Sequence, residues 1–170
     1  CRMLSGKKVL VLGLAKSGKA AVELLSAVHA TITVNEFALQ EQIECYDEYI
    51  ARGIEMIVGG HPDDLFERDF DFVVKNPGIN YHKPFVLRLK ERGIPVYTEI
   101  ELAYRLSQPQ NYIAITGTNG KTTTVTLIRD ILKNAGRQVC LAGNVGTPLS
   151  ELVLNEDLLH KSDYDVVLEM

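Results

Sequence analysis

The chain has 170 residues, of which 46% are hydrophobic and 24% are charged, with 13 glycines and 6 prolines. This composition suits one or two compact domains and excludes a disordered or fibrous chain. Eighteen Lys and Arg residues against 22 Asp and Glu residues give a formal net charge of -4, so we expect no nucleic-acid partner and no binding to an anionic membrane surface.

No apolar run approaches the ~20 residues that cross a bilayer, so we expect no membrane insertion. The first residues show no apolar segment followed by a small-residue cleavage site, and we therefore expect a cytoplasmic protein. Three widely spaced cysteines, without a Cys-x-x-Cys pair, predict neither a disulfide framework nor a zinc site.

The first hundred residues alternate short apolar strands with amphipathic helices. Strands are expected over 7–12, 31–34, 54–58, 72–74 and 95–97. Helices are expected over 19–28, 39–50, 85–89 and 99–106. Short buried strands that alternate with helices are typical of a parallel sheet covered by helices, which is an α/β fold.

The polar stretch Ser107-Gln108-Pro109-Gln110 separates two apolar blocks, where a domain boundary is expected. After it the pattern restarts, with strands over 112–116, 138–141 and 164–170 and helices over 121–135 and 149–154. We therefore predict a first domain over 1–106, a linker over 107–110 and a second domain over 111–170. Some sixty residues are too few for a complete second domain, so we expect the chain to be part of a longer protein.

The strongest chemical signal is Thr116-Gly117-Thr118-Asn119-Gly120-Lys121-Thr122-Thr123, between an expected strand and an expected helix. It is a variant of the P-loop, with Ile115 where the usual first glycine stands. In such a loop, backbone N–H groups surround phosphate oxygens and the lysine reaches the terminal phosphates, while the hydroxyl at Thr122 ligates Mg²⁺.

A second glycine turn, Gly13-Leu14-Ala15-Lys16-Ser17-Gly18, follows the first strand, with Ala15 in place of the middle glycine of a dinucleotide-binding turn. This turn and the next helix can hold a diphosphate, to which the Ser17 hydroxyl can donate. Asn35 and Glu36 end the second strand, where a group that contacts a ribose or a base is expected. A glycine turn that only packs a helix remains an open alternative on these residues.

Several of these motifs resemble those of one family. The segment from Ile113 to Thr123 resembles the ATP-binding loop of the Mur ligase and folylpolyglutamate synthase superfamily, which also lacks a glycine at the Ile115 position. Asn76-Pro77-Gly78-Ile79 resembles its Ser/Asn-Pro-Gly-Ile signature, and Gly143-Asn144-Val145-Gly146 resembles its Gly-Asn-Ile-Gly loop. Leu168-Glu169 is similar to the start of a further family segment.

The resemblance implies a Rossmann-like parallel-sheet domain, which holds the UDP of UDP-N-acetylmuramoyl-L-alanine, followed by the truncated start of a P-loop ATPase domain. In peptidoglycan precursor synthesis, ATP phosphorylates the substrate carboxylate and the amine of D-glutamate attacks the acyl phosphate. The implied protein is a monomer that uses ATP and Mg²⁺. The chain alone is expected to be inactive, because the domain that helps bind D-glutamate is absent.

The resemblance also implies the site residues. Substrate contacts are expected from Ser17, Gly18, Asn35, Glu36, Asn76, Gly78 and Asn144. ATP contacts are expected from Gly117, Thr118, Asn119, Gly120, Lys121, Thr122 and Thr123, with Lys121 and Thr122 as the catalytic pair and Thr122 and Glu169 as Mg²⁺ ligands. Members of the family often have Asp where Asn35 stands, so Asn35 is expected to act through its amide.

Two other functions remain open on the sequence. One is a related ligase that acts on another UDP-muramoyl peptide or on a folate, against which the segments 76–79 and 143–146 argue. The other is a nucleotide-binding module without enzymatic activity, in which Lys121 binds ATP as a signal. The four histidines, His29, His61, His82 and His160, have no metal-ligand spacing and are predicted to be surface or turn residues.

Overall fold

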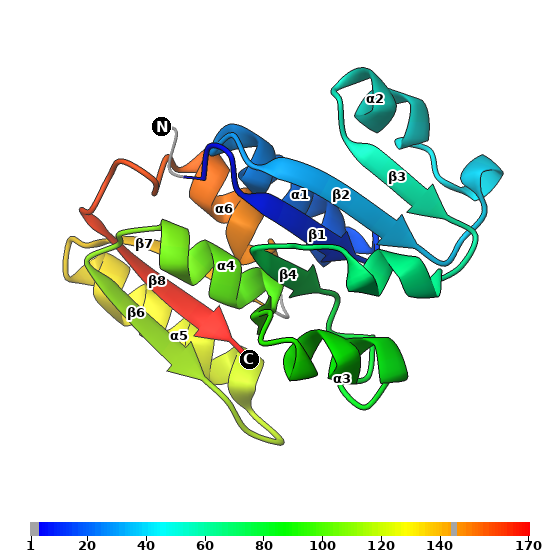
Figure 1. The fold of residues 1–170 in the computed structure, drawn as a ribbon. Coiled ribbons are helices and arrows are strands. Elements are labelled where there is room, and N and C mark those ends of the chain that lie inside the picture. Colours follow the sequence, from blue (N-terminus) through cyan, green and yellow to red (C-terminus); the bar gives the residue numbers. More distant parts are fainter. Residues whose placement is uncertain (1–3, 144–145) are drawn as a thin grey trace. The chain divides into compact units, whose positions relative to one another are not determined.

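The fold is described from a computed structural model, in which residues 4–143 and 146–170 are described (Figure 1). The chain divides into two compact units, Cys1–Glu99 and Ile100–Met170. Both units are α/β with parallel sheets, as predicted. Within the described ranges, no helix is both long and apolar enough to span a membrane.

The first unit is built on a five-stranded sheet with the strand order β3-β2-β1-β4-β5. Every pair of neighbouring strands is parallel. The strand order runs outward from β1 in both directions, so a topological switch point lies between β1 and β4. The strands are β1 (Lys8–Leu12), β2 (Thr31–Glu36), β3 (Glu55–Val58), β4 (Phe72–Lys75) and β5 (Val96–Tyr97).

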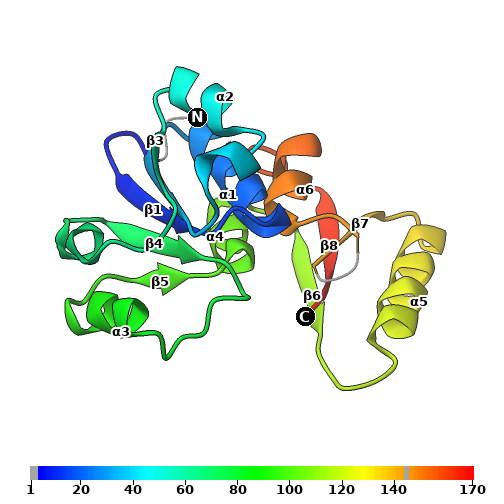
Figure 2. The same ribbon diagram turned by 90° about the vertical axis from the view of Figure 1, so that its right-hand side faces the viewer.

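Helices cover both faces of this sheet (Figure 2). Helix α1 (Lys16–Ala27) packs on one face and buries Ala21, Val22, Leu24 and Leu25. The other face carries a core of Leu10, Leu12, Leu65, Phe66, Phe70, Val73 and Leu89, to which η2 (Asp63–Glu67) and α3 (Pro84–Glu91) contribute. Val9 and Val11 alternate with Leu10 and Leu12 and are fully buried, as expected for a strand that is covered on both sides.

The helix expected over 39–50 is wrong in its extent. The structure has a 3₁₀ turn, η1 (Gln40–Gln42), and then a short helix, α2 (Tyr46–Ala51). Leu39 and Ile50 are 58% and 47% exposed, so the apolar spacing does not face a core. Tyr49 in α2 is buried, whereas no residue of η1 is, so the first part of the expected helix lacks the packing that stabilises helices in proteins.

The second unit has a three-stranded parallel sheet with the order β6-β8-β7. Helix α5 (Lys121–Asn134) packs on it through a core of Val125, Val139 and Val167. The other elements are α4 (Glu99–Leu106), β6 (Asn111–Ile115), β7 (Gln138–Gly143), α6 (Leu149–Asn155) and β8 (Tyr164–Glu169).

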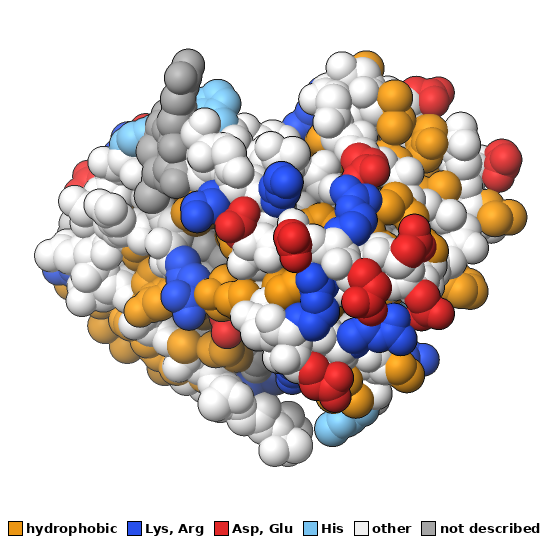
Figure 3. All heavy atoms as spheres, viewed as in Figure 1, with side chains coloured by type: hydrophobic (Ala, Val, Ile, Leu, Met, Phe, Trp, Pro, Cys, Tyr) orange, Lys and Arg blue, Asp and Glu red, His pale blue; other side chains and the backbone are white. Residues whose placement is uncertain are grey.

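The stretch predicted to be a linker is hydrogen-bonded within the second unit. Ser107 Oγ donates to the carbonyl oxygen of Ala103 at 2.6 Å, and the Gln110 N–H donates to the carbonyl oxygen of Tyr164 at 2.7 Å. The functional division into 1–106, 107–110 and 111–170 stays a prediction. On the face shown in Figure 3, basic and acidic side chains are interspersed.

The turn between β1 and α1 depends on a glycine at position 18. A Cβ at Gly18 would lie 2.0 Å from the carbonyl oxygen of Gly13, which is backbone and cannot swing away. We expect Gly18→Ala to lower the free energy of unfolding by about 3 kcal/mol, the upper end of the usual cost of overpacking. The neighbouring Lys19→Ala, on the exposed side of α1, should change it by less than about 0.5 kcal/mol. Urea denaturation measures both, and equal values would contradict the close approach.

Candidate functional site

A cavity of about 220 Å³ lies at the carboxyl edge of the first sheet, beside the switch point. Parallel pairing explains its position, because Leu12 of β1 is in register with Asn35 of β2 and with Lys75 of β4. The loops that follow these strands therefore meet. The cavity is lined by Gly13, Leu14, Ala15, Glu36, Phe37, His61, Asn76 and Ile79.

Gly13 and Asn76 face each other across the switch point. Gly13 has a φ of +89°, and a Cβ there would lie 3.0 Å from Asn76 Cβ. The Asn76 N–H donates to the carbonyl oxygen of Leu12 at 2.9 Å, and Asn76 Oδ1 accepts from the Gly78 N–H at 2.8 Å. No described residue accepts from Asn76 Nδ2, so this amide is available to a ligand in the cavity. Gly78 is exposed and outside the cavity lining, and its N–H is used by Asn76.

Ser17 and Gly18 lie in the first turn of α1 and do not line this cavity. The N-cap residue of α1 is Ala15, which has no side chain able to cap the helix. Ser17 is half-buried, and no described residue hydrogen-bonds its hydroxyl. The start of α1 thus offers a partial positive charge and a hydroxyl next to the cavity, as a diphosphate site requires.

Glu36 holds the glycine turn from the neighbouring strand. Its Oε2 accepts from the Leu14 N–H at 2.6 Å, and its Oε1 accepts from the Ala38 N–H at 3.2 Å. The side chain lines the cavity and is half-buried. Glu36 therefore shapes the site in addition to any contact that it makes with a ligand.

Asn35 lies behind the cavity and is fully buried. Its Nδ2 donates to the carbonyl oxygens of Ile57 at 2.9 Å and Gly60 at 2.8 Å, so both amide hydrogens are used. Its Oδ1 lies 2.5 Å from Nδ1 of His61. In this conformation the amide has no hydrogen to offer a ligand, so the direct contact expected from the sequence is replaced by a contact with His61, which does line the cavity.

His61, Phe37 and Lys75 lie at this site although the sequence patterns did not indicate them. His61 was predicted to be a surface or turn residue, but it follows β3 and lines the cavity at the same sheet edge. This position could not be inferred from the sequence, because it depends on the order of the strands in the sheet. Lys75 is 1% exposed and donates from Nζ to the carbonyl oxygens of Asn76 at 2.9 Å and Ile79 at 2.5 Å. Burial, with a smaller contribution from Lys90, lowers the pKa of Lys75.

The P-loop variant of the second unit, Thr116–Thr123, has backbone N–H groups without protein acceptors in the described residues. Gly120, with a φ of +77°, caps α5 and accepts from the Thr124 N–H at 3.0 Å. Among residues 4–143 and 146–170, none accepts a hydrogen bond from the backbone N–H groups of residues 119–123. Free N–H groups at the start of a 14-residue helix are suited to bind an anion.

Residues from the start of α5 meet Glu169, the last residue of β8, and Met170 beside this loop. Thr122 Oγ1 donates to Glu169 Oε2 at 3.0 Å, and Lys121 Nζ donates to the carbonyl oxygen of Met170 at 3.0 Å. Glu169 is 6% exposed and ends the central strand β8. The neighbouring strand β7 approaches Glu169 closely, since a Cβ at Gly143 would lie 2.2 Å from the carbonyl oxygen of Glu169.

The pair of Thr122 and Glu169 fits Mg²⁺, which prefers hard oxygen ligands. Mg²⁺ in phosphate sites commonly takes one or two protein oxygens and completes its shell with phosphates and water. The described residues contain no cluster of three His, Cys, Asp or Glu side chains that could hold a metal, and this coordination needs none. Asn144, the remaining predicted substrate contact, lies outside the described residues.

Comparison with known proteins matches both units to one family. Residues 7–98 match the Mur ligase MurD-like N-terminal domain, and residues 115–170 match the Mur ligase middle domain. The chain belongs to the Mur ligase family, and its first unit is of the MurD-like type. Solved structures agree at the level of fold, among them a murein peptide ligase Mpl from Psychrobacter arcticus (18% identity, TM-score 0.56, covering 96% of this chain and 37% of that one).

The curated relatives are more specific. UDP-N-acetylmuramoylalanine–D-glutamate ligase from Streptococcus uberis is 47% identical over 154 residues, which are 91% of this chain and 34% of the relative. The enzyme of the same name from Streptococcus thermophilus is 48% identical over 159 residues, 92% of this chain and 35% of the relative. The chain spans about a third of the length of these relatives.

The role of Asn35 can be tested with an isosteric change. Asn35→Asp would set a carboxylate against the carbonyl oxygens that the amide now donates to, and we expect it to lower the free energy of unfolding at pH 8 by about 1–3 kcal/mol. Asn80→Asp is the matched control. The side chain of the exposed Asn80 only accepts a hydrogen bond, at its Oδ1 from the His82 N–H at 2.8 Å, and a carboxylate can accept the same bond. Urea denaturation compares the two, and an Asn35→Asp protein as stable as the control would disprove the assigned amide orientation.

Proposed function

We propose that this chain forms the substrate-binding and ATP-binding parts of a ligase that joins D-glutamate to UDP-N-acetylmuramoyl-L-alanine at the expense of ATP, in cytoplasmic peptidoglycan precursor synthesis. The observation that carries the proposal is the meeting of Thr122 and Glu169, 47 residues apart in the chain, beside a loop of free backbone donors. The names of the relatives at 47–48% identity support the choice of substrates.

The first unit is proposed to hold the UDP part of the substrate. The diphosphate would meet the start of α1, where Ser17 can donate its hydroxyl and the backbone of Gly18 comes close to Gly13. The nucleoside would occupy the cavity between Glu36 and Asn76, whose Nδ2 is free to donate. This placement agrees with the rule that ligands of open α/β sheets bind outside the carboxyl ends of the strands at the switch point.

The second unit is proposed to hold ATP and Mg²⁺. The N–H groups of residues 119–123 would bind phosphate oxygens, and Lys121 would leave the carbonyl oxygen of Met170 to contact the terminal phosphates. Thr122 and Glu169 would hold Mg²⁺ in place of their mutual hydrogen bond. Bound Mg²⁺ offsets the negative charge that gathers on the phosphoryl group during transfer to the substrate carboxylate.

Residues 117–123 as the ATP site, and Lys121 and Thr122 as its catalytic pair, are part of this proposal. So are the substrate contacts from Ser17, Gly18, Glu36, Asn76, Gly78 and Asn144, and the monomeric state. Asn35 is retained as a residue that positions the cavity wall. The reaction itself would need the further length that the relatives possess.

The first test is binding of the nucleotide without ATP. We expect UDP and UDP-N-acetylmuramoyl-L-alanine to bind the intact ligase in calorimetry and NADH to give no heat. Ser17→Ala should weaken UDP binding about tenfold, since a hydrogen bond to a charged group is worth about 1.5 kcal/mol or more. Ser5→Ala, an exposed serine outside the cavity lining, is the control. Heat with NADH and none with UDP would contradict the proposal.

The second test separates the ATP site from the UDP site. Lys121→Ala in the intact ligase should lower ATP-dependent ligation more than 100-fold, roughly the effect of removing one partner of transition-state charge. UDP binding should not change. Lys133→Ala, in the exposed last turn of α5, is the matched control and should keep full activity. Phosphate release is the assay, and turnover by Lys121→Ala at the control's rate would refute the role of the lysine.

A further inference from the structure

His61 occupies a defined place in the wall of the first-unit cavity. Its Nδ1 lies 2.5 Å from Oδ1 of the buried Asn35, and its ring packs between Phe37 and Phe85, with ring centroids 5.8 Å and 4.7 Å away. The imidazole is therefore held by one hydrogen bond and two aromatic contacts.

The contacts of Asn35 determine which nitrogen of His61 carries the proton. Because Nδ2 of Asn35 donates to two carbonyl oxygens, its Oδ1 must be the atom that faces the ring. An amide oxygen only accepts, so Nδ1 of His61 carries the hydrogen and donates. In the neutral ring Nε2 then has a lone pair and is an acceptor.

Burial favours the neutral form of the ring. Burial lowers the pKa of His61, while the nearby carboxylate of Glu36 raises it and Lys83 lowers it by smaller amounts. Nε2 hydrogen-bonds no residue in the described part of the chain, and it is not an enclosed atom. The cavity wall thus presents one fixed, unused acceptor.

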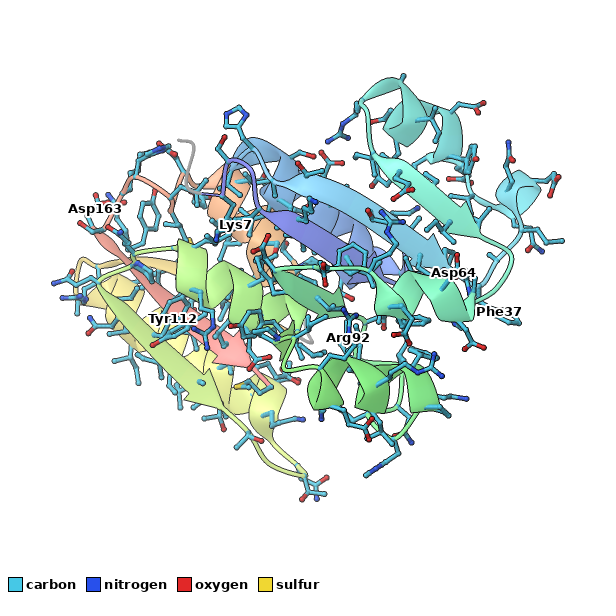
Figure 4. The ribbon with its side chains drawn as sticks, viewed as in Figure 1. Lys7, Phe37, Asp64, Arg92, Tyr112 and Asp163 are labelled. Carbon is cyan, nitrogen blue, oxygen red and sulfur yellow. The ribbon has the colours of Figure 1, made fainter. Side chains whose placement is uncertain are left out.

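The surroundings of this acceptor suit a flat aromatic ligand. Phe37 lines the cavity and is 71% exposed, so much of its ring is free to contact a ligand (Figure 4 shows it beyond the end of β2). Ile79 adds an apolar wall. A base that stacks on the free ring of Phe37 would offer its edge to His61, whereas a ribose has no flat face to match this surface.

We propose that His61 is a specificity-determining residue, whose Nε2 accepts a hydrogen bond from the imide N–H of the uracil base while the base stacks on Phe37. The inference rests on the proposed function, which places a uridine nucleotide in this cavity. Uracil carries a hydrogen on N3, whereas cytosine presents a lone pair there. A cytosine base would set two lone pairs against each other, so the arrangement selects uridine over cytidine.

The test compares ligands that differ at one atom. Calorimetry on the intact ligase measures Kd for UDP, CDP, N3-methyl-UDP and 2′-deoxy-UDP, with wild type, His61→Phe, His61→Gln and the control His82→Phe, an exposed histidine outside the cavity. Wild type and the control should bind UDP at least about tenfold more tightly than CDP or N3-methyl-UDP, and 2′-deoxy-UDP as tightly as UDP. In His61→Phe the UDP advantage should vanish, and His61→Gln, which keeps an acceptor, should restore part of it.

Three results would overturn the assignment of His61. One is a wild type that binds N3-methyl-UDP as tightly as UDP. Another is a His61→Phe protein that still prefers UDP over CDP. The third is loss of binding with 2′-deoxy-UDP alone, which would make a ribose hydroxyl the donor. If His61→Phe does not fold, as judged by its thermal transition, the wild-type ratios and His61→Gln decide. Failure of wild type to bind any uridine nucleotide would instead refute the proposed function.

Discussion

Parallel hydrogen bonding between neighbouring strands is the constraint on which both candidate sites depend. Because parallel strands end at one edge, the loops after β1, β2, β3 and β4 gather around the cavity of the first unit, and in the second unit the end of β8 lies beside the P-loop variant that follows β6. Each edge also needs one glycine where backbones nearly touch. Gly18 admits the carbonyl of Gly13, and Gly143 admits the carbonyl of Glu169. The sites are consequences of strand direction, refined at these two close approaches.

The sequence predicted the strands and most helices well because each has a local signal, such as a short apolar run, a helical spacing or a glycine at its end. It also located the edge residues Gly13, Glu36 and Asn76, since a residue just after a strand is at the edge whatever the strand order. It could not predict the partners that these residues take. Asn35 bonds the carbonyl of Ile57 because β2 and β3 pair in that register, and no local pattern in either strand specifies this. The overlong helix expected over 39–50 has the same origin, because periodicity does not reveal whether the whole of an apolar face has anything to pack against.

Lys75 shows that the conformation of a turn, which the sequence pattern did not reveal, can bury a charge at the end of a strand. At the end of the apolar run Phe72–Lys75, a lysine reads as the first solvated residue after a strand, yet its ammonium is enclosed by the turn that follows it. The carbonyl oxygens of Asn76 and Ile79 take two of its hydrogens, and the ring of Tyr81 lies 4.0 Å from Nζ. Burying a charge is costly unless it is hydrogen-bonded, so these contacts are what makes the position tolerable. The same contacts fix the carbonyls of the turn that carries Asn76 into the cavity.

The two sites differ in how far they are organised before a ligand arrives. In the first unit the side chains of Glu36, Asn35 and Asn76 hydrogen-bond backbone groups of the loops at the sheet edge, so the cavity walls are held by hydrogen bonds within the protein. In the second unit the loop over 116–120 is exposed and the helix donors behind it have no described acceptor. Groups that already have protein partners give shape and selectivity at little cost on binding, whereas unpaired donors gain most from a multiply charged anion. On the proposed function, the first unit would therefore supply selectivity for the nucleoside, and the second would supply most of the strength of ATP phosphate binding.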